Sequence, residues 1–300
     1  MSDLTLGVDL SDVVARLAVV DGDAQVLASA ELPPGGHTAS SIREAARRAI
    51  AGARGPVTRI GVAMPAAGDA VPPELTAALR DASSRETDVV TIAAGTAAAI
   101  AEQWCGAARG LKQVVTFAIG EHVTAGILLN GDPWFGAHGL ASSVAWLAMN
   151  PVEREDYRRY GGLEAEIATA GIVRRFVWRI KSGDQSVVSD RVNSDFTKIN
   201  ADDIFQASRD GDGVSISIVR DTAKYIGMAV ANLATMFDPE AIVLGGVIAN
   251  WGDQMLDASK VECARRLRPQ QAELVRIVLS TLGHDAVAIG AARAAARAGA

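Results

Sequence analysis

The pattern of hydrophobic and polar positions along the chain predicts alternating strands and helices. Three short runs rich in aliphatic residues open the sequence, at residues 4–10, 15–20 and 26–31. Polar residues separate these runs, which indicates three strands joined by short turns. An apolar stripe at helical spacing follows over residues 40–52, and a strand over residues 59–65 ends at a proline. The first part of the sequence then continues with a helix, a strand and a helix, over residues 72–82, 88–93 and 96–105.

The strand pattern restarts after residue 112, which indicates two related halves. Runs at residues 114–120 and 124–131 predict paired strands, and an Asn130-Gly131 turn ends the second one. Further along, the sequence predicts helices and strands over residues 163–180, 201–209, 214–236, 241–246 and 275–280. The polar segment 182–195 has no period and is expected to be an exposed loop or insertion. This order of elements predicts an α/β fold, in which helices cover the faces of mixed sheets.

The composition is that of a globular protein with a well-filled core. The 300 residues are 49% hydrophobic and 21% charged, and their net charge of −6 predicts no broad basic surface for nucleic acid. Cys105 and Cys263 are expected to be buried structural thiols. The sequence opens without a charged and apolar leader, and no apolar run reaches the roughly 18 residues that span a bilayer. We therefore expect a cytoplasmic protein with no membrane partner.

Long stretches of the second half resemble a known family. Residues 199–212 (INADDIFQASRDGD), 218–246 and 282–295 (LGHDAVAIGAARAA) are similar to the ROK family, which includes bacterial glucokinases, other hexose kinases and sugar-responsive repressors. The resemblance covers essentially the whole chain. It implies the actin/hexokinase-like (ribonuclease H-like) fold, in which two α/β domains close over ATP and sugar.

The resemblance also implies a domain organisation and an assembly. We expect an N-terminal α/β domain over residues 1–112 and a larger one over residues 113–285. A C-terminal helix over residues 286–300 is expected to pack back on the first domain. ROK proteins are commonly dimers, so a homodimer is expected. The family's repressors carry a winged-helix reader before the fold, whereas this sequence begins on the first strand, so we expect no binding to nucleic acid.

The two turns that bind phosphate in the family are altered here. The family's first turn, D-x-G-G-T-K, corresponds to residues 9–14, which keep Asp9, lose both glycines and gain the carboxylate of Asp12. Asp9 remains a candidate for facing a metal ion or water, although a hairpin with no phosphate role is the simpler interpretation. In the second turn, Glu121 stands where the family has a phosphate-facing threonine, and a carboxylate there repels a triphosphate.

One nucleotide-associated motif is preserved. The run LGG over residues 244–246 resembles the family's approach to the nucleotide, which makes Gly245 and Gly246 candidates for cofactor contact. A turn from strand to helix also favours glycine, so both interpretations stay open.

The catalytic base of the family has no counterpart in this sequence. In ROK kinases an Asn-Asp pair at the start of a helix binds sugar hydroxyls, and its Asp accepts the proton of the attacking one. The corresponding residues here are Ala93 and Ala94. Alanine can neither hold a hydroxyl nor accept a proton, so no catalytic residue is predicted.

The sugar and zinc positions are reduced to weak candidates. Glu164 resembles the family glutamate that touches sugar, but it also suits the first turn of a helix. His138 stands where the family commonly has Asn and is a second candidate for substrate contact. The family's zinc-binding Cys-x-Cys cluster is replaced by residues 152–162, which contain neither cysteine nor histidine, so no zinc is expected.

Together these replacements favour a pseudokinase that binds a sugar-like or nucleotide ligand or a partner, with no cofactor. The alternative is an ATP- and Mg²⁺-dependent hexose kinase with an altered active site and substrate. Whether the chain is an enzyme stays open at this stage.

Overall fold

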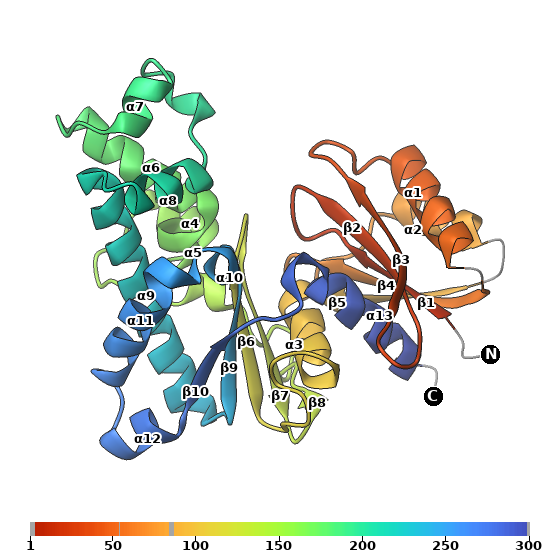
Figure 1. Ribbon diagram of the computed structural model, residues 1–300. Helices are drawn as coiled ribbons and strands as arrows, with labels where there is room; N and C mark the ends of the chain where they lie inside the picture. Colours follow the sequence, from red (N-terminus) through yellow and green to blue (C-terminus); the bar gives the residue numbers. More distant parts are fainter. Residues whose placement is uncertain (1–3, 54, 84–86, 299–300) are drawn as a thin grey trace. The chain divides into compact units, whose positions relative to one another are not determined.

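The computed structural model describes residues 4–53, 55–83 and 87–298. Two five-stranded sheets carry the fold (Figure 1). Contacts divide the chain into two compact units, and both are discontinuous in sequence. Unit 1 comprises Met1–Phe117, Thr124–Ser143 and Ser280–Ala300, and unit 2 comprises Ala118–Val123 and Val144–Leu279. The predicted domain ends at residues 112 and 285 remain predictions.

The first sheet has the strand order β3-β2-β1-β4-β5. Strand β1 is antiparallel to β2 and parallel to β4, and β5 is parallel to β4. The opening hairpins and the later parallel strands therefore share one mixed sheet. The bounds are Leu4–Asp9 for β1, Ala15–Val20 for β2, Val26–Leu32 for β3, Val57–Met64 for β4 and Asp88–Ala93 for β5.

Helices cover both faces of this sheet (Figure 1). Helices α1 (Ala39–Gly52) and α2 (Pro73–Ser83) form a core with one face, to which β1 contributes Leu4, Leu6 and Val8. Helices α3 (Ala94–Trp104) and α13 (Ala286–Ala298) pack against each other, and α13 crosses β1 and β4 on the other face. Because successive side chains of a strand point to opposite faces, Thr5, Gly7 and Asp9 share the face covered by α13.

Glycine makes the close approach of α13 possible. A Cβ atom at Gly7 would overlap the carbonyl oxygen of Ala288, and one at Gly61 would overlap that of Ala291. The same holds between the two helices, where a Cβ atom at Gly290 would overlap the carbonyl oxygen of Ala97. In each case the obstacle is backbone, which cannot turn aside as a side chain can.

The second sheet has the order β10-β9-β6-β7-β8. Its strands are β6 (Val114–Ile119), β7 (Val123–Leu129), β8 (Asp132–Pro133), β9 (Ala241–Gly246) and β10 (Arg276–Leu279). Strand β10 is parallel to β9, and β8 is antiparallel to β7.

The helices of unit 2 pack around the long helix α9 (Gly213–Phe237), which contacts α5, α6, α8 and α11. Asp212 caps the start of α9 by accepting a hydrogen bond from the backbone N–H of Ser215, and Asp238 ends it in the left-handed conformation. The other helices are α4 (Glu155–Tyr160), α5 (Glu164–Ile167), α6 (Thr169–Lys181), α7 (Val187–Arg191), α8 (Ala201–Arg209), α10 (Val247–Asn250), α11 (Gly252–Ala264) and α12 (Pro269–Leu274). Short 3₁₀ turns lie at Val144–Trp146, Phe196–Lys198 and Gly283–Asp285.

The prediction of an exposed loop over residues 182–195 is wrong, because this segment contains α7. Ser186 caps the helix, and the carboxylate of Asp212 accepts hydrogen bonds from the Ser186 hydroxyl and the Val187 backbone N–H. Val188 is buried. This short helix is held by contacts with a distant residue, which local periodicity does not reveal.

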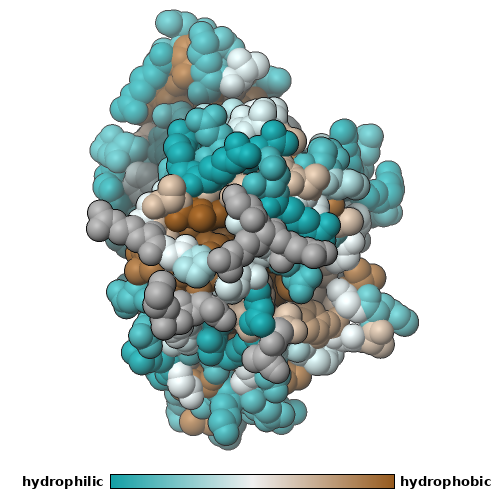
Figure 2. Space-filling view, turned by 90° about the vertical axis from the view of Figure 1, so that its right-hand side faces the viewer, coloured by the Kyte–Doolittle hydropathy of each residue, from teal (hydrophilic) through white to brown (hydrophobic). Residues whose placement is uncertain are grey.

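One face of the molecule is mostly polar (Figure 2). On the face shown in Figure 2, hydrophilic residues cover most of the area, and hydrophobic residues gather near its centre. Among the residues with described positions, no helix is both long enough and apolar enough to cross a bilayer.

Candidate functional site

Asp9 and Ala94 lie at the same edge of the first sheet. Asp9 ends β1 and pairs with Ala63 of β4, and the next residue of β4, Met64, pairs with Ala93 at the end of β5. The carboxyl ends of parallel strands form one edge, where ligands bind in open α/β sheets. Asp9, predicted to face a metal ion, and Ala94, which the resemblance places at the base position, therefore share the edge at which a ligand is expected.

The Asp9 carboxyl group is buried and engaged locally. Its side chain is 3% exposed, and its Oδ1 atom accepts hydrogen bonds from the Ser11 backbone N–H (2.8 Å) and the Ser11 hydroxyl (2.6 Å). Burial raises the pKa of Asp9, and the Ser11 hydrogen bonds oppose this shift only in part. The ionised form is thus disfavoured relative to an exposed aspartate.

Replacing Asp9 by Asn is expected to stabilise the protein at neutral pH. A raised pKa means that the folded state binds the proton more tightly than the unfolded chain, whose value is near 3.8, so the ionised carboxylate costs stability above the folded pKa. This cost disappears below pH 3.8. We therefore expect Asp9→Asn to be more stable than the wild type at pH 7.

Urea unfolding of the wild type and Asp9→Asn between pH 4 and pH 7 measures this difference. The advantage of the variant should shrink as the pH falls. Asp132→Asn is the control, since Asp132 is exposed on β8. A constant or negative difference for Asp9→Asn would show that the Asp9 charge is compensated.

No polar side chain caps the first turn of α3. Ala93 is the N-cap and provides no side-chain hydrogen bond, and Ala94 is 1% exposed. The Thr116 hydroxyl donates to the Gly95 carbonyl oxygen (2.9 Å) and accepts from the Gly126 backbone N–H (3.1 Å). These contacts fix the first turn of α3 on β7, so the residue at 94 is rigidly placed and carries only a methyl group.

Two carboxylates hold the turn between β6 and β7 through hydrogen bonds. Glu164, on α5, accepts hydrogen bonds from the Val123 backbone N–H (2.9 Å) and pairs with Nδ1 of His122 (3.2 Å). Glu121 accepts a hydrogen bond from the Thr169 hydroxyl (2.9 Å). Both carboxylate oxygens of Glu164 are therefore engaged by the turn itself. This geometry gives Glu164 a structural role beside the sugar contact that the resemblance implies, and the sugar contact stays a prediction.

Gly246 is required by the backbone at the end of β9. Its φ angle is +67°, and a Cβ atom there would overlap the carbonyl oxygen of Ile119. Residue 246 must therefore be glycine whether or not a nucleotide binds. Gly245 precedes it in β9 and is half-buried. Nucleotide contact by either glycine remains a prediction.

His138 belongs to an exposed loop of unit 1. The flanking Gly136 and Gly139 both have positive φ angles, of +71° and +72°, which shape the loop around the histidine. The His138 side chain is exposed and therefore accessible to a ligand. Its contact with a substrate remains a prediction.

Residues 152–162, which replace the zinc-binding cluster, are anchored by Glu166 of α5. The Tyr157 hydroxyl donates a short hydrogen bond to Glu166, and Nη1 of Arg154 lies 3.5 Å from the same oxygen. Burial and the neighbouring Glu166 carboxylate raise the pKa of Tyr157 well above its usual value. Within the described parts of the chain, no three His, Cys, Asp or Glu side chains gather closely enough to hold a metal ion.

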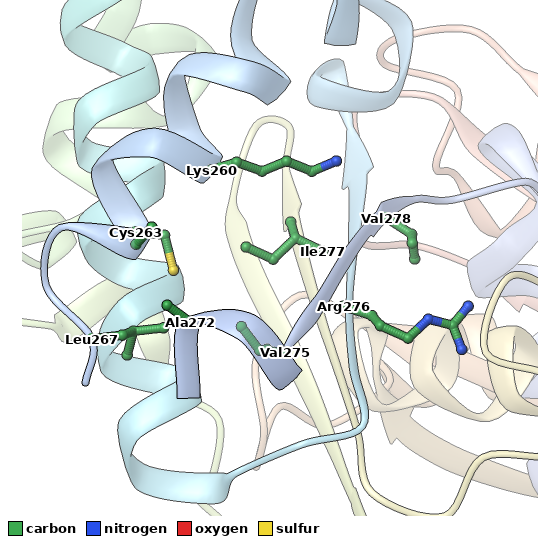
Figure 3. Close-up of a pocket in the computed structure, with 9 residues that line it drawn as sticks. Lys260, Cys263, Leu267, Ala272, Val275, Arg276, Ile277 and Val278 are labelled. Carbon is green, nitrogen blue, oxygen red and sulfur yellow. The ribbon is translucent and has the colours of Figure 1, made fainter. Parts of the chain in front are cut away.

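A cavity of about 420 Å³ lies between α11, α12 and β10 (Figure 3). Its walls are largely apolar, and the side chains of Lys260 and Arg276 extend in one direction, away from Cys263 and Leu267. Burial raises the pKa of Cys263 to about 11, so this thiol stays protonated at neutral pH and is a poor nucleophile. The cavity therefore offers apolar contact and positive charge without catalytic chemistry.

The chain belongs to the ROK family, whose model matches residues 5–298. It is 31% identical to a glucokinase of Halalkalibacterium halodurans over 219 residues, which cover 71% of this chain and 65% of that protein. It is 26% identical to a xylose repressor of Caldicellulosiruptor bescii over 202 residues, 65% of this chain and 48% of that protein. The chain thus spans less than two thirds of the length of these relatives.

Solved structures show the same fold. A ROK family glucokinase from Streptomyces griseus, in complex with glucose and AMPPNP, superposes with a TM-score of 0.79 at 24% identity, covering 98% of this chain and 99% of that one. A ROK hexokinase from Thermus thermophilus gives a TM-score of 0.77 at 24% identity, with coverage of 99% and 100%. These matches confirm the actin/hexokinase-like fold that the resemblance implied.

Sequence reasoning missed the cluster around Glu166, in which Arg175 also takes part. Its members come from three segments, so no single motif contains them. The signal that was available is the spacing of Arg175 and Arg179, which places two cations on one face of a helix.

Proposed function

We propose that this ROK protein is a pseudokinase, which binds a small sugar-like or nucleotide ligand or a partner but does not transfer phosphate. The observation that carries this proposal is the start of α3, where Ala94 is buried and Ala93 provides no side-chain hydrogen bond. The resemblance implies that Ala94 stands where the family has its catalytic base. Without a group that accepts the proton of the attacking hydroxyl, phosphoryl transfer loses one of its main contributions.

The residues of the two turns also fit a magnesium nucleotide poorly. Asp9 is the candidate for facing a metal ion, but burial raises its pKa and Ser11 occupies one of its oxygens. In the other turn Glu121 adds an exposed carboxylate where a phosphate would bind. A carboxylate close to a triphosphate is repulsive, and a partly desolvated site strengthens this effect.

The second candidate function is an ATP-dependent hexose kinase with an altered active site. The 31% identity to a glucokinase and the buried Asp9 favour it. Under this alternative, Asp9 is the residue that faces the metal ion with its remaining oxygen, and ATP with Mg²⁺ is the cofactor.

A turnover assay separates the two functions. We expect no formation of ADP above background when the purified protein is incubated with ATP, Mg²⁺ and a panel of hexoses, while a ROK glucokinase assayed in parallel is active. Calorimetry with ATP, with and without Mg²⁺, should show no binding that requires the metal. Sugar-stimulated turnover together with metal-dependent binding at micromolar ATP would overturn the pseudokinase.

The Asp9→Asn variant is the control for a contaminating kinase in this assay. Any turnover that belongs to this chain should be lost in Asp9→Asn, which preserves the hydrogen bonds from Ser11. Turnover that is unchanged in the variant would come from another protein. A thermal-shift panel of sugars and nucleotides then identifies the ligand class, because a ligand that binds only the folded state raises the unfolding temperature.

The proposal includes a homodimer in the cytoplasm, as the resemblance implies for ROK proteins. Sedimentation analysis of the purified chain tests the dimer directly.

A further inference from the structure

A large cavity inside unit 2 carries an excess of positive charge. It measures about 670 Å³ and lies between α6, α9 and the segment that leads into α4. Its cationic lining residues are Arg154, Arg174, Arg175, Arg179 and Lys224. Its acidic lining residues are Asp156, Glu166 and Asp221. The whole chain has a net charge of −6, so this excess of two positive charges is a local feature.

Two arginines one helical turn apart reach from α6 to hydroxyl groups on α9. Arg175 donates to the Thr222 hydroxyl, and Nη1 of Arg179 donates to the Ser217 hydroxyl (3.2 Å). These bonds hold both guanidinium groups between the two helices. Each guanidinium has five N–H donors, so both keep donors for a further acceptor.

Arg175 is the cation with the least compensation. Its side chain is 16% exposed, and its Nε atom is buried without a hydrogen-bond partner. The nearest carboxylate oxygen, on Glu166, lies 3.7 Å from that atom. Glu166 is shared with Arg154 and Tyr157, so one buried carboxylate serves two arginines. Arg174 and Arg179 differ in this respect, because they pair with Asp156 and Asp184.

The cavity also has an apolar wall. Met149, Ile218 and Met228 line it together with the rings of Trp178 and Tyr225. Trp178 is 66% exposed, so its ring is accessible to a ligand at the cavity. Aromatic and thioether side chains bind flat apolar groups, whereas guanidinium groups bind phosphate through parallel N–H donors.

We propose that this cavity binds a small organic phosphate, with the phosphate on Arg175 and Arg179 and a flat organic part against Trp178. The dianionic phosphate supplies the negative charge that Glu166 alone does not provide. Lys224, on α9, also lines the cavity and pairs with Asp221 (3.0 Å). This site lies wholly within unit 2 and involves none of Asp9, Ala94 or Glu164. It therefore does not depend on whether the protein is a kinase.

Calorimetry with phenyl phosphate tests the site, with inorganic phosphate and phenol as partial probes, all at constant ionic strength. We expect saturable binding of phenyl phosphate that is several-fold tighter than that of inorganic phosphate, and no measurable binding of phenol. Arg179→Gln should weaken phenyl phosphate about tenfold, since a lost hydrogen bond to a charged group costs about 1.5 kcal/mol or more. Trp178→Ala should weaken phenyl phosphate and leave inorganic phosphate unchanged.

Arg158→Gln is the matched control, because Arg158 pairs with Glu153 on the surface and does not line the cavity. If Arg158→Gln weakened the binding of phenyl phosphate equally, the effect would be a general electrostatic attraction, and the proposal would be overturned. Absence of saturation at millimolar phenyl phosphate would overturn it too, as would equal affinity for inorganic phosphate. Sedimentation of the same variants tests a different occupant, a second copy of this chain. If the wild type is a dimer and Arg179→Gln dissociates it, the second copy fills the cavity and the proposal is overturned.

Discussion

Replacing Gly290 by valine is expected to unfold unit 1 or to leave it only marginally stable. Helices α3 and α13 meet at this residue, where even a Cβ atom would overlap the carbonyl oxygen of Ala97. The whole helix would have to move away, which would also disturb the contact of α13 with β1 and β4. Overpacking a well-packed core typically costs about 1–3 kcal/mol, and we expect a loss at or above the upper end.

Urea unfolding monitored by circular dichroism measures this loss. Gly213→Ala is the control, because Gly213 begins α9 and a Cβ atom there meets open space. We expect Gly213→Ala to change the free energy of unfolding by less than about 0.5 kcal/mol. If Gly290→Val were as stable as this control, α3 and α13 would not be in close contact in solution.

Removal of the Glu166 carboxylate is expected to destabilise unit 2 by about 3–5 kcal/mol, the usual cost of breaking a buried ion pair. Glu166→Ala leaves Arg175 without its nearest carboxylate and Tyr157 without its acceptor. Part of the loss comes from the buried guanidinium of Arg175, which then loses its strongest compensating charge and keeps only the weaker influence of Tyr225 and Asp221. The free energy of unfolding by urea is again the measurement.

Two further variants isolate the cause. Glu153→Ala removes an exposed ion pair with Arg158 and should cost less than about 1 kcal/mol. Glu166→Ala should also cost less when Arg175 is replaced by Met, since the uncompensated charge is then absent. Equal losses in the two backgrounds would mean that Arg175 does not depend on Glu166.

Much of the fold could be predicted from the sequence where local signals agree with tertiary structure. Helix α8 occupies the predicted residues 201–209, because Asn200 and Asp203 form a capping box at its start. Strand β9 likewise occupies the predicted residues 241–246, a continuous aliphatic run that ends in two glycines. Helix α7 was missed because its first turn is held by the carboxylate of Asp212, which lies 17 residues beyond the end of the segment 182–195.

For the candidate site, the sequence could predict only which family residues are replaced. Ala94 and Glu121 were found by matching positions to a family motif, which shows what is absent but not what replaces it. The contact that holds the turn of Glu121, from the Val123 backbone N–H to Glu164, joins residues 41 positions apart, so spacing gives no indication of it. The bond from Tyr157 to Glu166 spans nine residues but matches no helical or strand period. Their geometry follows from how α5 packs, and packing of a four-residue helix is set by its neighbours.

The position of α13 has a consequence for how the chain folds during synthesis. Strand β1 lies near the start of the sequence, and the helix that covers one of its faces lies near the end. At a translation rate of roughly 5–20 residues per second, the ribosome needs tens of seconds to make what lies between them. Throughout that time the face of β1 and β4 that carries Gly7 and Gly61 is uncovered. Unit 1 therefore cannot reach its final packing on the ribosome until α13 has emerged.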